Sequence, residues 1–575
     1  MKMSKQSFNL VIDPWIKVIE KDTNQEKLVS LTEFFQEAQN YRQLAGEMRS
    51  QDLAILRFLL AILTTVYSRF DANDEPYEWL DVDKEALQVS QSVDDDEYDQ
   101  SDLQETWHQL FQAGHFSEIV IRYLNQHQKQ FDLFGSQPFY QVTADQYDLL
   151  VPTKKKVASG SGTVSIKQMN RLISESNNTP SLFTPKSEDE KNKIALDELT
   201  RWLITYQNFT GVTDKTKIET DEKFSTPAGW LYKLNPVAAK GQSVFETLML
   251  NLILFNQDTK DHYIQQKPVW EYDNINDYVT ERKKMILPDD VSSLYTAWAR
   301  LLHIEWDENE QPTIFSAGLP MYSSENAFKV EPMSTWKHDA QGGADDLKPA
   351  VKSTRSLGIA MWRNFGQYIN VEKTDGNVTG VEPGLVTWLH ALKNKGLIEK
   401  NRHLNLISAV LVSDGNATSQ APVVEVTDDL TIRADVLFDT EGTQRWPIRI
   451  ENMIDTTQQI GKDFWQFAAT IGQIRNLDAR SFASQQSATF YEQLNTPFKL
   501  WLASLSNDDD RDAKELAWKH DLRQIVLDSA EAFMQTSTSR DITGIIVTTK
   551  EKSREINIFT ANNYLRHNVQ KHLEG

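Results

Sequence analysis

The chain contains no cysteine among its 575 residues. This absence excludes a disulfide framework, a thiolate-bound metal and a cysteine nucleophile. An excess of positive charge is missing too, because 60 Lys and Arg face 82 Asp and Glu and leave a formal net charge of −22 at pH 7. Proteins that coat nucleic acid nonspecifically carry the opposite balance. Any contact with nucleic acid is therefore expected at a small basic site on a mostly acidic protein.

Long apolar runs are also missing. No stretch reaches the ~18 consecutive apolar residues that a membrane-spanning helix needs. The longest candidate, residues 53–66, carries Arg57 and is interrupted by Thr64 and Thr65, which predicts a buried helix. The first 15 residues lack the apolar segment of a signal peptide. Together with the absence of cysteine, these features predict a cytoplasmic protein with no membrane partner.

Motifs of familiar enzymes are absent as well. The sequence has no GxxxxGK[ST], HExxH or GxSxG motif. This favours a protein that is not an enzyme and uses no cofactor. His338 and Asp339 leave one alternative open, since an HD pair is typical of metal-dependent phosphohydrolases. The nearest other histidines, His303 and His390, do not stand at the spacing of metal ligands.

Hydrophobic periodicity predicts an α+β fold with two parts. Residues 1–440 mix helical and alternating patterns, and we expect one large mixed domain there. From Trp446 onward, apolar residues recur at helical spacing with short connections, which predicts a C-terminal four-helix bundle over residues 441–575. Residues 541–549 (DITGIIVTT) are β-branched and do not fit that bundle pattern.

The same patterns predict individual elements. Helices are expected at residues 51–67, 102–128, 194–207, 241–255 and 492–505, the last interrupted at Pro497. Strands are expected twice within residues 8–18, on both sides of a turn within residues 317–365, and at residues 404–412. Residues 153–166 are rich in Lys, Gly and Ser and are expected to be flexible, and residues 208–225 are expected to form a polar linker.

Three short motifs share an order and spacing with a known family. Residues 131–139 (FDLFGSQPF) predict a compact turn held in a core by its phenylalanines. This motif, the IDPWI of residues 12–16 and the KPVWE of residues 267–271 together resemble the CasA family. CasA is the large subunit of Cascade, the type I-E CRISPR surveillance complex. The resemblance extends over nearly the whole chain and implies the functional residues that follow.

The first implied site is a loop that contacts the protospacer-adjacent motif (PAM), a short DNA sequence beside the target. In this sequence the match covers NRLISESNNTPSLFTP, and the expected contacts are Asn177, Asn178, Leu182, Phe183 and Thr184. A turn-rich loop can place an aromatic ring and amides against the DNA backbone or a groove edge. Family members also bring a glycine-rich loop close to the PAM, and Gly211 is the glycine at the matching place.

The second implied site is a lysine that enters the DNA minor groove. The pattern Pro-Met-x-x-Trp-Lys resembles the family segment that bears it, and its lysine here is Lys337, with Lys329 as a second candidate. The minor groove presents the same acceptors at A·T and T·A pairs. A lysine there would favour a set of PAM sequences rather than a single one.

The third implied site is a wedge. The strand expected at residues 404–412 leads into a polar tip, VSDGNATSQAP, at residues 412–422. In the family, a loop at this place carries a glutamine that wedges under the PAM and splits the first target base pair. Ser419, Gln420 and Ala421 occupy that place in this sequence.

The resemblance therefore implies a non-catalytic subunit of an RNA-guided complex in antiviral defence. Its expected partners are the crRNA-bearing backbone and small subunits of Cascade, double-stranded target DNA with a PAM, and a helicase–nuclease recruited in trans. Two alternatives stay open: a metal-dependent hydrolase with a site near His338 and Asp339, and a purely structural subunit that does not touch DNA.

The bundle is the less acidic part of the chain. Residues 446–575 hold 15 Lys and Arg against 17 Asp and Glu, so most of the negative charge lies upstream. This part is the better candidate for contact with displaced DNA or a neighbouring subunit. The basic residues that could make such contacts are Arg475, Arg480, Lys519 and Arg523.

Overall fold

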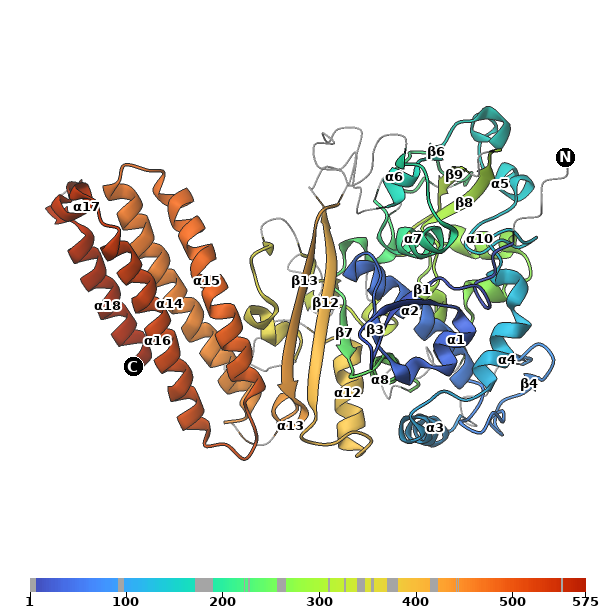
Figure 1. The fold of residues 1–575 in the computed structure, drawn as a ribbon, viewed down its shortest axis with the longest axis horizontal. Helices are drawn as coiled ribbons and strands as arrows, with labels where there is room; N and C mark the ends of the chain where they lie inside the picture. The colour runs from blue at the N-terminus through green and yellow to red at the C-terminus, as the bar shows by residue number, and fades with distance from the viewer. Residues whose placement is uncertain are drawn as a thin grey trace. The chain divides into compact units, whose positions relative to one another are not determined.

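The computed structural model describes the chain except for residues 1–6, 92–97, 171–189, 212, 222, 226–227, 256–264, 309–310, 325–326, 339–346, 353–355, 370–380, 414–421, 441, 443, 550–551 and 575. Helices and strands are both abundant, which confirms the predicted α+β class (Figure 1). The chain forms two compact units. Unit 1 contains Met1–Leu357, Glu382–Ala391 and Leu406–Asp428, and unit 2 contains Gly358–Val381, Leu392–Asn405 and Asp429–Gly575.

The units are not continuous in sequence. Three segments that precede residue 441 pack with the C-terminal helices as part of unit 2. A boundary between independent domains at residues 440 and 441 therefore stays a prediction.

Helix α2 (Arg49–Tyr67) forms the core of unit 1, and 17 of its 19 residues are buried. It confirms the helix predicted at residues 51–67. In the described part of the chain it is the one helix long and apolar enough to cross a membrane, but 94% of its most apolar window is buried inside the protein. The other helices of unit 1 are α1 (Leu31–Gln36), α3 (Gln100–Ala113), α4 (Ile119–Gln126), α5 (Ala144–Leu150), α6 (Ile166–Met169), α7 (Leu196–Phe209), α8 (Val244–Asn251), α10 (Ile275–Lys283), α11 (Val291–Tyr295) and most of α12 (Gly384–Asn394).

Small sheets surround these helices. One has the order β2-β1-β3, another β6-β9-β8 and a third β13-β12-β7, and two hairpins pair β4 with β5 and β10 with β11. Strands β8 and β9 are antiparallel, with Arg300 opposite Gly318 and Trp306 opposite Pro312. The strands are β1 (Ile16–Glu20), β2 (Glu26–Val29), β3 (Tyr41–Leu44), β4 (Val82–Asp83), β5 (Gln88–Val89), β6 (Thr163–Val164), β7 (Val237–Lys240), β8 (Arg300–Trp306), β9 (Pro312–Gly318), β10 (Trp336–His338), β11 (Leu347–Pro349), β12 (His403–Ser413) and β13 (Pro422–Arg433).

Short 3-10 helices connect several of these elements. They are η1 (Ala38–Asn40), η2 (Gln128–Phe131), η3 (Thr153–Lys155), η4 (Val157–Ser159), η6 (Trp230–Lys233), η7 (Val269–Glu271), η8 (Ala327–Lys329) and, in unit 2, η10 (Met361–Gln367).

Two predicted elements of the N-terminal part are wrong. Residues 8–18 contain one strand, not two, because the Asn9 carbonyl accepts hydrogen bonds from Ile12 and Asp13 and closes a turn there. The helix predicted at residues 102–128 is two helices, α3 and α4. Gly114 ends α3 with φ +75°, a left-handed conformation that glycine adopts without a steric penalty.

The segment predicted to be flexible at residues 153–166 is folded. It contains η3, η4 and β6, and Ser161 Oγ donates a hydrogen bond to the Lys154 carbonyl at 2.7 Å. The predicted polar linker at residues 208–225 is also partly buried, since Thr210 and Thr216 are 0% and 4% exposed. Serine and threonine hydroxyls satisfy the backbone of such turns locally, which composition alone does not reveal.

The family-like motif at residues 131–139 packs on α2. Phe131 and Phe139 place their rings 6.2 Å and 5.6 Å from that of Phe58 in α2. Both rings are buried as predicted. Phe134 is only half-buried, and the neighbouring Leu133 is buried instead. The compact turn is therefore confirmed, with a different set of anchors.

Unit 2 contains the predicted helical bundle. Its long helices are α14 (Trp446–Ile474), α15 (Ala479–Ala503), α16 (Arg511–Gln535) and α18 (Ile558–Glu574), and α13 (Ala434–Leu437) and α17 (Ser539–Thr543) are short. Aromatic rings fill the core, with Phe464 stacked on Phe490 at 4.7 Å between centroids. The predicted interruption at Pro497 is wrong, because α15 continues through that residue. Much of residues 541–549 forms β14 (Ile545–Thr549), which pairs with β15 (Lys552–Ile556).

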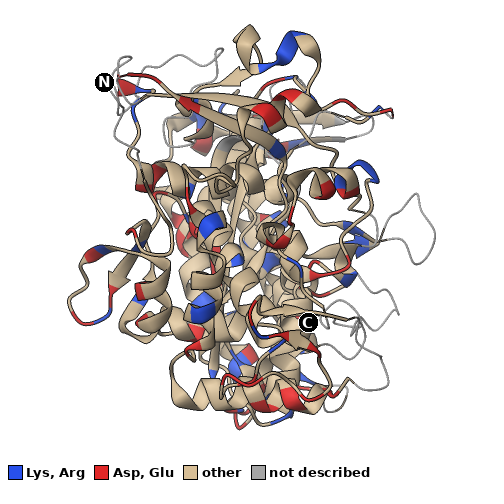
Figure 2. Ribbon diagram, turned by 90° about the vertical axis from the view of Figure 1, so that its right-hand side faces the viewer, with Lys and Arg blue, Asp and Glu red and all other residues tan. Residues whose placement is uncertain are grey.

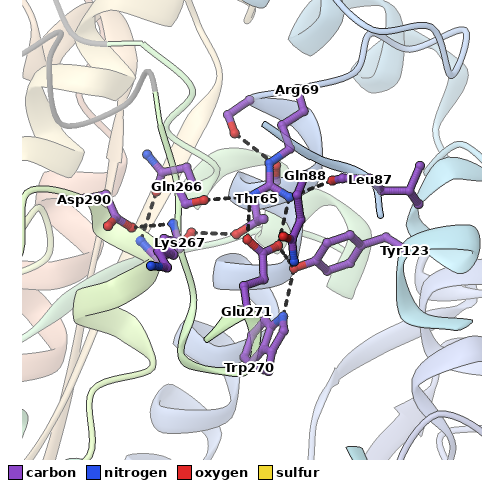
Figure 3. A network of polar contacts seen from close by, with 12 residues as sticks. Thr65, Arg69, Leu87, Gln88, Tyr123, Gln266, Lys267, Trp270, Glu271 and Asp290 are labelled. Atoms are coloured by element: carbon purple, nitrogen blue, oxygen red, sulfur yellow. Dashed lines mark hydrogen bonds and ion pairs between the residues drawn. The ribbon is translucent and has the colours of Figure 1, made fainter. Parts of the chain in front are cut away.

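Two buried ion pairs fix α2 in unit 1. Arg57, near the middle of the helix, donates two hydrogen bonds to Glu331, at 2.8 Å to Oε1 and 2.7 Å to Oε2, and both side chains are fully buried. Arg69, just beyond the C-terminal end of α2, pairs with Glu271 at 2.8 Å. Figure 3 shows Tyr123 bridging this second pair to Trp270: the Tyr123 hydroxyl donates to Glu271 at 2.6 Å and accepts from Trp270 Nε1 at 2.8 Å.

Removing one partner of the central pair should destabilise unit 1 strongly. Loss of either side chain leaves a buried charge without compensation, which costs about 3–5 kcal/mol. We expect Arg57→Ala and Glu331→Ala each to lower the opening free energy of the α2 amides by about this amount, measured by native-state hydrogen exchange. The Arg57→Met/Glu331→Leu variant should recover part of the loss because no lone charge remains.

Bundle amides in the same experiment serve as an internal reference. A second control is Arg523→Ala, which removes an exposed ion pair with Glu574 at 3.1 Å. It should leave exchange in α2 unchanged. Equal exchange in wild-type protein and both alanine variants would contradict the role given to the Arg57–Glu331 pair.

Candidate nucleic-acid interface

Lys337 lies on a short hairpin of unit 1. Strand β10 pairs with β11 in antiparallel register, so Trp336 faces Pro349 and Lys337 faces Lys348. Successive residues of a strand point to opposite faces. Trp336 is fully buried and packs edge-on against Phe328, and the lysine that follows it is exposed.

Lys348 is a neighbour that sequence reasoning did not identify. Its side chain is exposed like that of Lys337, directly opposite on the partner strand. The two lysines place positive charge on both strands of this hairpin, which favours contact with a phosphate or a groove edge that carries negative potential. The pairing could not be read from the sequence because residues 339–346 separate the two strands.

The root of this hairpin is bound to strand β7. The Val237 amide donates to the Met333 carbonyl at 2.7 Å, and Pro236 forms a bridge with Ser334. On the other side, the Ala350 amide donates to the Thr335 carbonyl at 2.9 Å. These backbone contacts hold the chain on both sides of Lys337.

The stem of the predicted wedge rests on the same strand. β12 confirms the strand predicted at residues 404–412, and it lies between β13 and β7 in the sheet. Adjacent strands joined by a connection of eight residues are antiparallel, so Ser413 and Pro422 lie at the same end of the hairpin. Ser408 Oγ hydrogen-bonds Asn235 Oδ1 at 3.1 Å, just before β7 begins. Ser419, Gln420 and Ala421 themselves lie outside the described residues.

An electrostatic interaction also links the two hairpins. Burial lowers the pKa of Lys352, three residues after β11, and the nearby carboxylate of Asp428 in β13 opposes this shift. The end of β11 is therefore within electrostatic range of β13. The roots of the lysine hairpin and of the β12–β13 hairpin are neighbours in unit 1.

Glu425 ties β13 to the N-terminus of α2. No side chain at the start of this helix caps it, but the Ser50 amide donates to Glu425 Oε1 at 2.6 Å. A carboxylate at this position satisfies an unpaired N–H and interacts favourably with the helix dipole. Glu425 stands 375 residues away in sequence from the amide that it binds, so no local pattern announces it.

A second carboxylate lies at the same helix end. Asp52 Oδ1 accepts the Gly46 amide at 2.7 Å. Burial raises the pKa of Asp52 to about 6, the Gly46 amide and Arg49 oppose the shift, and the negative charge of Glu425 adds to it. The protonation state of Asp52 and the anchor of β13 are therefore electrostatically coupled.

The loop expected at the PAM is described only at its root. Asn177, Asn178, Leu182, Phe183 and Thr184 lie outside the described residues. Asn170, at the end of α6, is buried and donates to Glu198 of α7 at 2.8 Å. This contact fixes where the loop leaves the protein.

Gly211 is buried rather than presented at a surface. The Thr210 hydroxyl donates to the Gly211 carbonyl at 3.0 Å, and the Gly229 amide donates to the Thr210 carbonyl at 2.8 Å. The backbone at residue 229 lies so close to the end of α7 that a Cβ there would meet the Asn208 carbonyl at 2.2 Å, which explains the glycine at this position. In this arrangement the backbone of Gly211 is covered by the protein itself.

Glu331 joins these roots. Besides the two hydrogen bonds from Arg57, its carboxylate accepts the Trp230 indole N–H at 2.6 Å and the Met333 amide at 3.0 Å. Trp230 follows the Gly229 contact with the end of α7, and Met333 begins the root of the Lys337 hairpin. One carboxylate therefore fastens α2, the segment beside Gly211 and the lysine hairpin to each other.

The structure gives no support to a metal site at His338. In the described part of the chain, no three His, Asp or Glu side chains are placed to hold a metal ion. His338 is exposed at the end of β10, and Asp339 lies outside the described residues. Lys329, the second lysine candidate, is exposed at the end of η8.

Two of the basic residues suggested in the bundle are engaged by carboxylates. Arg475 pairs with Asp541 at 2.9 Å and Arg523 with Glu574 at 3.1 Å. Arg480 is exposed and Lys519 half-buried. Figure 2 shows Lys and Arg positions interspersed with Asp and Glu positions along the ribbon.

Comparison with known proteins gives one consistent result. The sequence model of the CRISPR-associated protein Cse1 family matches residues 9–529. A crystal structure of Thermobifida fusca Cse1 is similar over 100% of this chain and 99% of that one, with 19% identity and a TM-score of 0.74. Thermus thermophilus CasA (Cse1) is similar over 99% of both chains, with 17% identity and a TM-score of 0.65.

A chain of a structure described as a CRISPR RNA-guided surveillance complex is also similar, over 99% of both chains, with 12% identity and a TM-score of 0.61. At these identities the likeness of the structures shows the fold alone. No curated protein sequence matches the chain.

The carboxylate pair at the start of α2 predicts a specific pH dependence. The folded chain binds the Asp52 proton more tightly than the unfolded chain, whose aspartates titrate near pH 3.9. Stability contributed by the neutral form is therefore lost as pH rises from about 4 to about 6. Asp52→Asn should remove this loss, so the variant should gain stability relative to the wild type as pH rises through that window. The measurement is the urea midpoint of each protein at pH 4.5 and at pH 7.5.

Glu425→Gln provides the matched comparison. Removing the negative charge of Glu425 should lower the pKa of Asp52 and move the pH-dependent difference to lower pH. If the pH-dependent effect of Asp52→Asn is the same in the wild-type and the Glu425→Gln background, the two carboxylates are not coupled.

Proposed function

This chain belongs to the CRISPR-associated Cse1 family, and on that basis we propose that it is the large, non-catalytic subunit of a type I-E CRISPR RNA-guided surveillance complex. It recognises the PAM in double-stranded target DNA and wedges the duplex open so that guide RNA can pair. Support comes from the family match and from the fold that this chain shares with a surveillance-complex subunit.

One observation supports the DNA-recognition part most directly. The Lys337 hairpin and the β12–β13 hairpin, whose connection carries Gln420, are both rooted at β7 and the residues just before it. A minor-groove lysine and a wedge must act at neighbouring steps of one duplex. A shared root is the arrangement that this mechanism requires.

The proposed roles follow from the chemistry of the two side chains. Lys337 is a single ammonium on a long stem, suited to the acceptors that A·T and T·A pairs present alike in the minor groove. Gln420 would enter between stacked pairs, where unstacking costs a few kcal/mol. Pairing of guide RNA with the opened strand is a nearly balanced exchange, so lowering the cost of the first opening is enough to start it.

The proposal includes the partners and the absence of catalysis. The chain would bind crRNA-bearing backbone and small subunits and help recruit a helicase–nuclease, in the cytoplasm and without a cofactor. A metal-dependent hydrolase near His338 and a purely structural subunit remain the alternatives. Metal content of the purified protein tests the first, and gel shifts of the assembled complex on duplexes with and without a PAM test the second.

Lys337→Ala should weaken discrimination between duplexes with and without a PAM. Loss of one groove contact is expected to reduce the ratio of the two affinities by about ten-fold, or ~1.4 kcal/mol. The measurement is a gel shift of the reconstituted complex at fixed salt, because the phosphate contribution varies with ionic strength. Lys84→Ala is the matched control, since Lys84 is exposed in the β4–β5 turn, which Figure 1 shows apart from β12 and β13. Equal loss in both variants would mean that Lys337 acts only as a surface charge.

Gln420→Ala should slow strand opening and leave PAM binding largely intact. If the wedge offsets part of the unstacking cost of a few kcal/mol, opening should slow by about ten-fold or more. The rate is followed with a fluorescent base at the first target pair. A target already mismatched at that pair should restore the wild-type rate, because there is nothing left to split. Failure of the mismatch to rescue the variant would contradict the wedge.

A further inference from the structure

One end of the helical bundle carries an irregular structure that the proposed function does not use. It consists of the α14–α15 turn, α17, the β14–β15 hairpin and the start of α18. Arg475, at the end of α14, pairs with Asp541 of α17 at 2.9 Å, and Arg540 donates to the carbonyl of Ile474. These contacts hold the turn and α17 against each other. Figure 1 shows α17 at one end of the bundle.

The hairpin is fixed to the same end. Gly544 has φ +75° and lies so close to β15 that a Cβ would meet the Ile556 carbonyl at 2.3 Å. Ile545 and Ile556 form the first pair of the hairpin, and Ile556 is buried. The side chains of the opposite face therefore point away from the bundle core.

Large apolar side chains are exposed at this end. They come from four consecutive pieces of the structure: Leu477 is 50% exposed, Ile542 50%, Ile546 74% and Phe559 48%. Single exposed apolar residues are ordinary on a protein surface, but several of them on neighbouring elements are typical of a surface that binds another molecule.

The hairpin also presents a sheet edge. β14 and β15 form a two-stranded sheet, so each has one edge that no other described strand pairs with. Natural proteins protect such edges with charged residues or proline. β15 (KSREI) carries Lys, Arg and Glu, whereas β14 (IIVTT) has neither charge nor proline. The edge of β14 is the one that lacks protection.

The rim of this surface is basic. Arg480, Arg540 and Arg554 are exposed, and within the described residues none of them has an ion-pair partner. Three carboxylates are described at this end. Asp541 pairs with Arg475, and Asp478 caps the Ser481 amide at 2.8 Å. Glu555, opposite Ile546 on β15, accepts a hydrogen bond from the Asn557 side-chain amide at 3.2 Å. In a chain of net charge −22, a group of exposed arginines without a described ion-pair partner favours an acidic partner.

We propose that this end of the bundle binds an extended, acidic segment of a partner protein, which pairs with the edge of β14 as a third strand. Its backbone satisfies the β14 edge, its apolar side chains cover Ile546, and its carboxylates face Arg480, Arg540 and Arg554. This is strand addition, in which backbone hydrogen bonds supply affinity and alternating side chains supply specificity. The family match ends at residue 529, before α17 and the hairpin, and the inference does not depend on DNA recognition.

The test uses the full chain and a fluorescein-labelled decapeptide that alternates Val and Glu. Anisotropy should show saturable binding, and hydrogen exchange should show at least ten-fold slower exchange of the β14 amides in its presence. Ile546→Asp should weaken binding at least ten-fold. The matched control is Leu516→Asp, because Leu516 is 63% exposed on α16 near the opposite end of the bundle. It should bind like the wild type.

Several outcomes would overturn the proposal. The first is that the Val–Glu peptide does not bind at 1 mM. The second is that a decapeptide alternating Val and Lys binds as tightly as the Val–Glu peptide. The third is that Ile546→Asp and Leu516→Asp weaken peptide binding to the same extent. Protection of β14 that grows with protein concentration alone, together with dimers in sedimentation, would assign the edge to a second copy of the chain. Protection by duplex DNA alone would assign it to nucleic acid.

Discussion

The carboxylate of Glu331 is buried without access to water, and a charge in such a place persists only when every acceptor position is matched by a donor. The donors come from three parts of unit 1: Arg57 of α2, the Trp230 indole and the Met333 amide. This requirement holds the segments that contain Trp230 and Met333 close to α2. It places the root of the Lys337 hairpin beside β7, and β7 also carries the β12–β13 hairpin.

The rest of the candidate interface divides into rigid roots and the residues they present. Backbone pairing to β7, the Glu425 contact with α2 and the Asn170 contact with α7 fix the roots. Of the proposed contact residues, Lys337 lies on β10, and Gln420 belongs to the connection between β12 and β13. In the proposed function, a few side chains on fixed stems would provide specificity at one spot of the DNA, and the net negative charge of the chain would suppress nonspecific binding elsewhere.

Much of this fold could be predicted from local pattern. The apolar run of α2, the strand β12 and the helical spacing of the bundle all correspond to observed elements, because periodicity reports burial directly. The errors share another cause. The break at Gly114 and the folded segment around Ser161 depend on turn chemistry. The Arg57–Glu331 pair and the Glu425 cap join residues 274 and 375 positions apart, and Lys348 became a neighbour of Lys337 only through the hairpin register.

The central claim is that Lys337 and Gln420 reach neighbouring positions of one duplex. Site-specific photocrosslinking tests it most directly, with a photoreactive amino acid placed at residue 337 or 420 of the full chain in the assembled complex. The account predicts that both positions crosslink to the target DNA, at the PAM and at the first base pair beside it, and only when a PAM is present. Crosslinks more than one helical turn apart, or from one of the two positions alone, would contradict it.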